Sequence, residues 1–142
     1  MLTKLEHAAL SVHDLERSIA FYRDVIGFEV QRILEPDPAL PLEKVIALQR
    51  ARARIAHLWL GGVMLELFQY IQPQGRPIRE DFTQADHGYT HIALASTDAR
   101  ADYEYLRSKG VEFYSEPMEF RPGVWICFFR GPDGETVEIR QA

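Results

Sequence analysis

The pattern of apolar and polar positions along this chain occurs twice. Alternating apolar residues predict a strand over residues 5–12, and apolar positions at helical spacing follow it. The same succession begins again with a predicted strand over residues 89–96. Aspartate often caps a helix N-terminus and glycine often ends a helix, so both halves predict a strand followed by a bounded helix. The residues that bound these two helices are Asp14 with Gly27, and Asp98 with Gly110.

Each predicted helix is followed by three further strand patterns, rich in β-branched and aromatic residues. In the first half they lie at residues 28–30, 55–60 and 63–70. In the second half they lie at residues 111–113, 124–129 and 136–140. Each half therefore reads β-α-β-β-β. We predict one compact α+β domain with a first module at residues 1–70, a linker at 71–87 and a second module at 88–142.

Two His and Glu pairs occupy equivalent places in the two modules. His7 and His91 lie on the first strand of their modules, and Glu66 and Glu138 lie on the last. Side chains alternate across a strand, and each of the four falls on the less apolar face. Two imidazoles and two carboxylates suit a divalent ion such as zinc, nickel, cobalt, manganese or ferrous iron. We therefore predict that these four residues hold one metal ion, with positions left for water or substrate.

Composition narrows the classes of function. The net charge of -5 argues against nucleic acid as the main partner, because phosphate binding needs a basic surface. Cys127 is the only cysteine, so no internal disulfide can form, and its apolar surroundings predict a buried thiol. No signal segment or membrane span is recognisable, so a cytoplasmic location is expected. The other histidines have no repeat partner and are weaker candidates for a catalytic role: His13, His57 and His87.

Over nearly its whole length the chain resembles the vicinal oxygen chelate superfamily, which contains glyoxalase I, methylmalonyl-CoA epimerase, extradiol dioxygenases and the bleomycin- and fosfomycin-resistance proteins. The motifs that carry the resemblance are His7 and residues 14–22, 27–28, 88–94 and 129–138. The resemblance implies paired βαβββ modules that curl as a mixed sheet around a metal-binding cleft. It also implies a homodimer, in which the site could draw its ligands from one chain or from two.

Glyoxalase I has His, Glu, His and Glu at the places held here by His7, Glu66, His91 and Glu138. The epimerase usually has Gln at the place of Glu66, and the dioxygenases use only the other three positions, with iron. The presence of Glu66 therefore favours the four-ligand, redox-neutral branch. The insert at residues 35–54 departs from glyoxalase I and disfavours a glutathione-derived substrate.

The resemblance implies a chemistry for the site. A metal that chelates two adjacent oxygens of a small substrate would stabilise an enediolate or enolate, while Glu138 or Glu66 removes a proton next to the carbonyl. The enzyme would then be a lyase or an isomerase. Candidate pocket walls, with ordinary core packing as the alternative, are Met64, Phe68, Trp59, Trp125, Phe129 and Arg140. Two other classes stay open: an iron-dependent extradiol dioxygenase, and a metal-free drug-binding protein.

Overall fold

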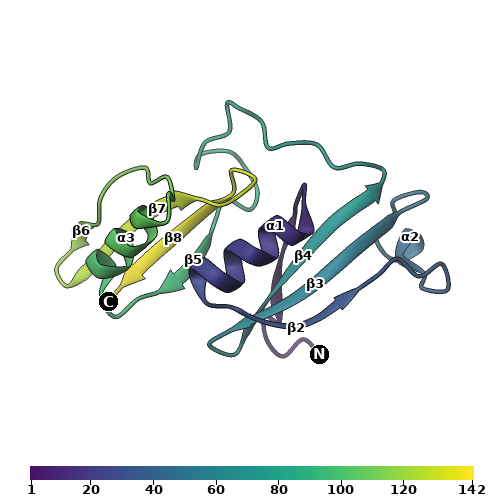
Figure 1. Cartoon of the computed structure of the whole chain (residues 1–142), viewed down its shortest axis with the longest axis horizontal. Coiled ribbons are helices and arrows are strands. Elements are labelled where there is room, and N and C mark those ends of the chain that lie inside the picture. Colours follow the sequence, from purple (N-terminus) through teal and green to yellow (C-terminus); the bar gives the residue numbers. More distant parts are fainter. The chain divides into compact units, whose positions relative to one another are not determined.

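The computed structural model describes all 142 residues, which form two compact units, Met1–Pro77 and Ile78–Ala142 (Figure 1). Each unit is a four-stranded mixed sheet with a helix on one face, and neither sheet is closed. The α+β class and the pair of repeated modules are thereby confirmed. None of the helices has the length and apolar character needed to cross a membrane.

The first unit begins with a strand and a helix and ends with a long hairpin. Its elements are β1 (His7–Ser11), α1 (Leu15–Ala20), the π-helical segment η1 (Phe21–Ile26), β2 (Glu29–Leu34), α2 (Leu42–Val45), β3 (Arg52–Leu60) and β4 (Val63–Gln72). The strand order is β1-β4-β3-β2, with β1 parallel to β4 and the other neighbours antiparallel. Gly61 and Gly62 both have positive φ, which a tight two-residue hairpin turn requires.

The second unit repeats this plan with shorter elements. They are β5 (Ile92–Ala95), α3 (Ala99–Ser108), β6 (Met118–Arg121), β7 (Val124–Arg130) and β8 (Thr136–Gln141). The strand order is β5-β8-β7-β6, again with the first strand parallel to the last. The strand predicted over residues 111–113 is wrong, because this segment forms only an isolated bridge from Phe113 to Phe129. Pro117 lacks an N–H and restricts the residue before it, so a regular ladder begins only at Met118.

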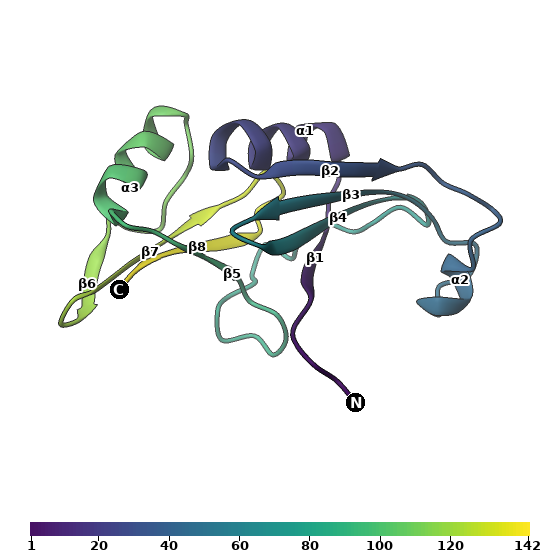
Figure 2. The ribbon, with the colours of Figure 1, turned by 90° about the horizontal axis from the view of Figure 1, so that it is seen from below.

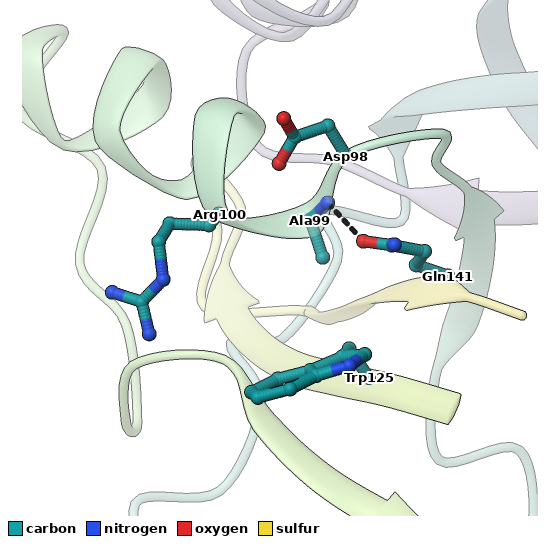
Figure 3. A pocket seen from close by; sticks show the side chains of 5 residues that line it. All are labelled: Asp98, Ala99, Arg100, Trp125 and Gln141. Atoms are coloured by element: carbon teal, nitrogen blue, oxygen red, sulfur yellow. Dashed lines mark hydrogen bonds between the residues drawn. The ribbon is translucent and has the colours of Figure 1, made fainter. Parts of the chain in front are cut away.

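Two side-chain hydrogen bonds hold the start of each helix, α1 and α3. The predicted caps are confirmed, since side chains of two aspartates accept hydrogen bonds from first-turn N–H groups: Asp14 and Asp98. In addition, Oε1 of Gln69 in β4 accepts from the N–H of Leu15 at 3.1 Å. Oε1 of Gln141 in β8 accepts from the N–H of Ala99 at 2.8 Å (Figure 3). Each glutamine stands three residues after the glutamate of the same strand, so this tie belongs to the repeat.

The helices cover one face of each sheet and leave the other face for the glutamates. Figure 2 shows α1 along the first sheet and α3 along the second, and they pack on β3 with β4 and on β7 with β8. The buried side chains between helix and sheet include Leu15, Ile19, Tyr22, Leu58 and Leu67 in the first unit, and Leu106, Cys127, Phe129, Val137 and Ile139 in the second. Strand alternation then turns Glu66 and Glu138 to the opposite face.

Candidate metal centre

In the first unit, β1 brings His7 to Glu66 on β4. Nε2 of His7 lies 3.2 Å from Oε2 of Glu66. The other ring nitrogen, Nδ1, donates a hydrogen bond to the carboxylate of Glu6. This hydrogen bond raises the pKa of His7 and lowers the pKa of Glu6 relative to their ordinary values. In the neutral form of the ring, Nδ1 holds the proton and the lone pair lies on Nε2, the nitrogen that faces Glu66.

The second unit repeats this arrangement with His91 and Glu138. Nε2 of His91 lies 3.2 Å from Oε2 of Glu138. Nδ1 of His91 lies 2.9 Å from Oε1 of Gln84, a carbonyl oxygen that only accepts, so the proton sits on Nδ1. The amide nitrogen of Gln84 donates to the backbone carbonyl of Thr90 at 3.3 Å, and this oxygen can only accept, so the orientation of the amide is fixed. Gln84 lies in the predicted linker, and its role was missed because nothing in its local sequence indicates it.

Both pairs suit a metal ion in their chemistry. In each, Nε2 of an imidazole faces a carboxylate oxygen at 3.2 Å, while Nδ1 donates to a second acceptor, as is usual for metal-ligating histidines. The carboxylates are largely buried, with 15% of the side chain exposed for Glu66 and 12% for Glu138. Neither unit alone gathers three or more such ligands. Each supplies two of the four predicted ones, and the four-residue set stays a prediction.

A third histidine contacts Glu66. Nε2 of His57, in β3, lies 2.8 Å from Oε1 of Glu66, and Nε of Arg32 donates to Nδ1 of His57 at 2.9 Å. The sequence makes His57 a weak candidate, because it has no counterpart in the repeat. The hairpin does predict this contact. A two-residue turn at residues 61–62 pairs residues that are equally distant from it on β3 and β4. His57 and Glu66 are such a pair, and the register bears this out.

Three predicted pocket residues lie on the face of Glu66. Met64 and Phe68 alternate with Glu66 along β4, and Trp59 pairs with Met64 across the hairpin. Met64 is buried, whereas Phe68 is half-buried and stacks on Tyr70 with ring centroids 5.7 Å apart. Burial, and then the charge of Glu66, raise the pKa of Tyr70. Phe68 and Tyr70 therefore form an apolar wall beside this carboxylate.

The structure corrects the predicted role of Phe129. This side chain is completely buried and packs against Phe113, with ring centroids 5.3 Å apart. It pairs with Val137, not with Glu138, and so belongs to the helix-covered face. Its neighbour Phe128 pairs with Glu138 and makes an edge-to-face contact with His91. The wall beside Glu138 is therefore Phe128.

Trp125 also lies on the helix-covered face. It lines a small pocket at the start of α3 together with Asp98, Ala99, Arg100 and Gln141 (Figure 3). Trp125 does not lie beside Glu138, because it is three residues from Phe128 along β7 and an odd number of positions places a side chain on the opposite face. Arg140, two residues after Glu138, shares its face and is exposed, as the alternation predicts.

The buried thiol of Cys127 should resist alkylation in the folded protein. It is 1% exposed, and burial raises its pKa to about 11. Only about one molecule in a thousand would carry the reactive thiolate at pH 8. We expect negligible labelling by iodoacetamide over hours in buffer and complete labelling within minutes in concentrated urea, measured by mass spectrometry. Rapid labelling of the folded protein would contradict the burial of this strand.

Comparison with known proteins shows the family to which this chain belongs. The model of the Glyoxalase/Bleomycin resistance protein/Dioxygenase superfamily matches residues 4–139. A 2-epi-5-epi-valiolone epimerase from Actinomyces sp. is 35% identical over 95% of this chain and 77% of its own length. A lactoylglutathione lyase from Salmonella typhimurium is 29% identical over 98% of this chain and 93% of its own. A glyoxalase family protein from Bacillus cereus has the same fold, with a TM-score of 0.86 at 18% identity over 99% of this chain and 94% of its own.

Proposed function

Since the chain belongs to the Glyoxalase/Bleomycin resistance protein/Dioxygenase superfamily, we propose that it is a divalent-metal-dependent enzyme that moves a proton next to a substrate carbonyl. The observation that carries this proposal is the repeated geometry of the two pairs. In each, Nε2 of a histidine faces a carboxylate oxygen at 3.2 Å, and Nδ1 is held by an acceptor. The epimerase relative at 35% identity supports epimerisation as the first reaction to test, and the lyase relative supports the glyoxalase reaction as the second.

In this proposal the metal ligands are His7, Glu66, His91 and Glu138. Imidazole nitrogen and carboxylate oxygen together suit nickel, cobalt, zinc or manganese. When bound, such an ion supplies a positive charge that stabilises the negative charge that develops on the substrate oxygens.

The proton is moved by a carboxylate of this chain. We assign the base to Glu138 or Glu66, each largely buried and beside an aromatic side chain. The carboxylate removes the proton from the carbon next to the carbonyl, and the electron pair of the C–H bond moves into the enolate. Return of the proton to the opposite face of the same carbon gives an epimer. Return to the neighbouring carbon gives the isomer that a glyoxalase reaction requires.

The test measures metal content and proton exchange together. We expect about one divalent ion per chain in protein purified without a histidine tag. In D₂O, we expect deuterium to enter the carbon next to the carbonyl of a cyclic polyhydroxyketone, an acyl-CoA or a hemithioacetal, read by NMR. A chelator should abolish exchange and the added ion should restore it. His91→Ala should weaken metal binding, whereas His87→Ala, which removes an exposed histidine outside both pairs, should not.

Other results would select another class. Iron as the bound metal, with oxygen consumed in the presence of catechols, would replace this proposal by an extradiol dioxygenase. No bound metal and no uptake of added metal would favour a small-molecule binding protein.

A further inference from the structure

We propose that His57 is a positioning residue that holds the carboxylate of Glu66 in place, and that Arg32 fixes the form of the His57 ring for this task. The inference rests on the proposed function in that Glu66 is taken as a metal ligand. The contacts that support it lie wholly within the first unit, between neighbouring strands of one sheet.

The donors and acceptors in this chain of contacts allow one arrangement only. Nε of Arg32 carries a hydrogen and can only donate, so Nδ1 of His57, 2.9 Å away, must accept. A neutral imidazole whose Nδ1 accepts carries its proton on Nε2. Nε2 of His57 therefore donates to Oε1 of Glu66 at 2.8 Å. The two contacts run in a single direction, from the guanidinium through the ring to the carboxylate.

This chain of contacts leaves Glu66 with one free oxygen. Oε1 is occupied by His57, while Oε2 faces Nε2 of His7 at 3.2 Å. His57 is almost fully buried, with 8% of its side chain exposed, so water competes little for this hydrogen bond. Rotation of the carboxylate would break the contact with His57 and leave a buried N–H without a partner, which is costly. Glu66 is therefore held with Oε2 as the oxygen that can bind an ion.

The second unit lacks this device. The residue opposite Glu138 on the neighbouring strand is Phe128, which has no hydrogen to donate. His91 is the polar side chain that contacts Glu138. The repeat thus places two chemically identical carboxylates in different settings, one with a histidine donor on the neighbouring strand and one with a phenylalanine there. A clamped carboxylate suits a permanent ligand, and the variant His57→Phe would give the first unit the arrangement of the second.

The first test reads the ring directly and needs no metal. In metal-free protein labelled with ¹⁵N, we expect the ring resonances of His57, assigned by comparison with His57→Gln, to show a neutral imidazole protonated on Nε2. A ring protonated on Nδ1, or on both nitrogens, would overturn the assignment of Arg32 as the residue that sets its form.

The second test measures metal affinity by competition with a chromophoric chelator. Loss of an outer partner of a metal ligand typically weakens binding 10- to 100-fold, and we expect His57→Phe to do so. His57→Gln, which keeps an N–H donor, should recover most of the affinity. Arg32→Met, a milder change should His57→Phe fail to fold, should give an intermediate loss. Glu35→Gln removes an exposed partner of Arg54 in the same unit and should leave affinity unchanged.

The outcomes separate this inference from the function on which it rests. If the unaltered chain binds a divalent ion and His57→Phe binds it equally well, the positioning role is overturned and the proposed function stands. If the unaltered chain binds no ion, the proposed function fails, and the role of His57 toward a metal fails with it. If His57→Gln is as weak as His57→Phe, the hydrogen bond is not what matters.

Discussion

Glu138→Gln is expected to lower kcat by about 10²- to 10⁴-fold at saturating metal, because an amide cannot accept the substrate proton. The substitution keeps the size of the side chain and an oxygen that can bind an ion. The far-ultraviolet circular dichroism and the urea midpoint should therefore stay close to those of the unaltered chain. Deuterium exchange into the substrate is the appropriate measurement, since it reports proton removal even when the overall reaction is limited by another step.

A matched control is available in the same unit. Glu112→Gln makes the same chemical change at an exposed position outside the candidate site and should leave exchange unaltered. Full exchange in Glu138→Gln would remove Glu138 from the role of base and transfer the hypothesis to Glu66. Loss of exchange in both Glu138→Gln and Glu66→Gln, with metal still bound, would indicate that both carboxylates act on the proton.

Phe129→Ala should lower the free energy of unfolding by about 3–5 kcal/mol, because it removes a large side chain from the core and leaves a cavity. Phe129 has no exposed surface and contacts Phe113. Urea denaturation followed by circular dichroism measures the effect. Tyr105→Ala on the exposed side of α3 is the control and should cost less than about 1 kcal/mol. Equal losses in the two variants would contradict the packing of β7 against the helix.

The elements that follow from local signals were predictable from the sequence. Asp14 and Asp98 cap α1 and α3. Gly27 ends η1, which continues α1, and Gly110 follows the end of α3; both glycines have positive φ. These features depend on a few neighbouring residues, so one sequence suffices to find them. The pairing of His7 with Glu66 was predictable for another reason: the same His and Glu recur at equivalent places in the second half, as His91 and Glu138.

The features that were missed depend on register or on contacts distant in sequence. Phe129 was predicted on the wrong face of β7. A shift of one residue along a strand moves a side chain from one face of the sheet to the other, so Phe128 lies on the face of Glu138 and Phe129 lies in the core. Gln84 reaches His91 from a loop whose path no periodic pattern specifies. His57 is predictable by counting outward from the hairpin turn, but it is absent from the repeat pattern because Phe128 occupies the equivalent place in the second unit.

The hydrogen bonds from Gln69 and Gln141 to the helix starts bear on the origin of the two halves. Gln69 and Gln141 hold no ligand position, yet each makes the same hydrogen bond to the first N–H of its helix. Independent acquisition of a metal site would make the two halves alike only in the ligands. Likeness that extends to a structural brace is what duplication of an ancestral half-length gene leaves behind. On that history, His57 and Phe128 occupy one ancestral position at which the two copies have since diverged.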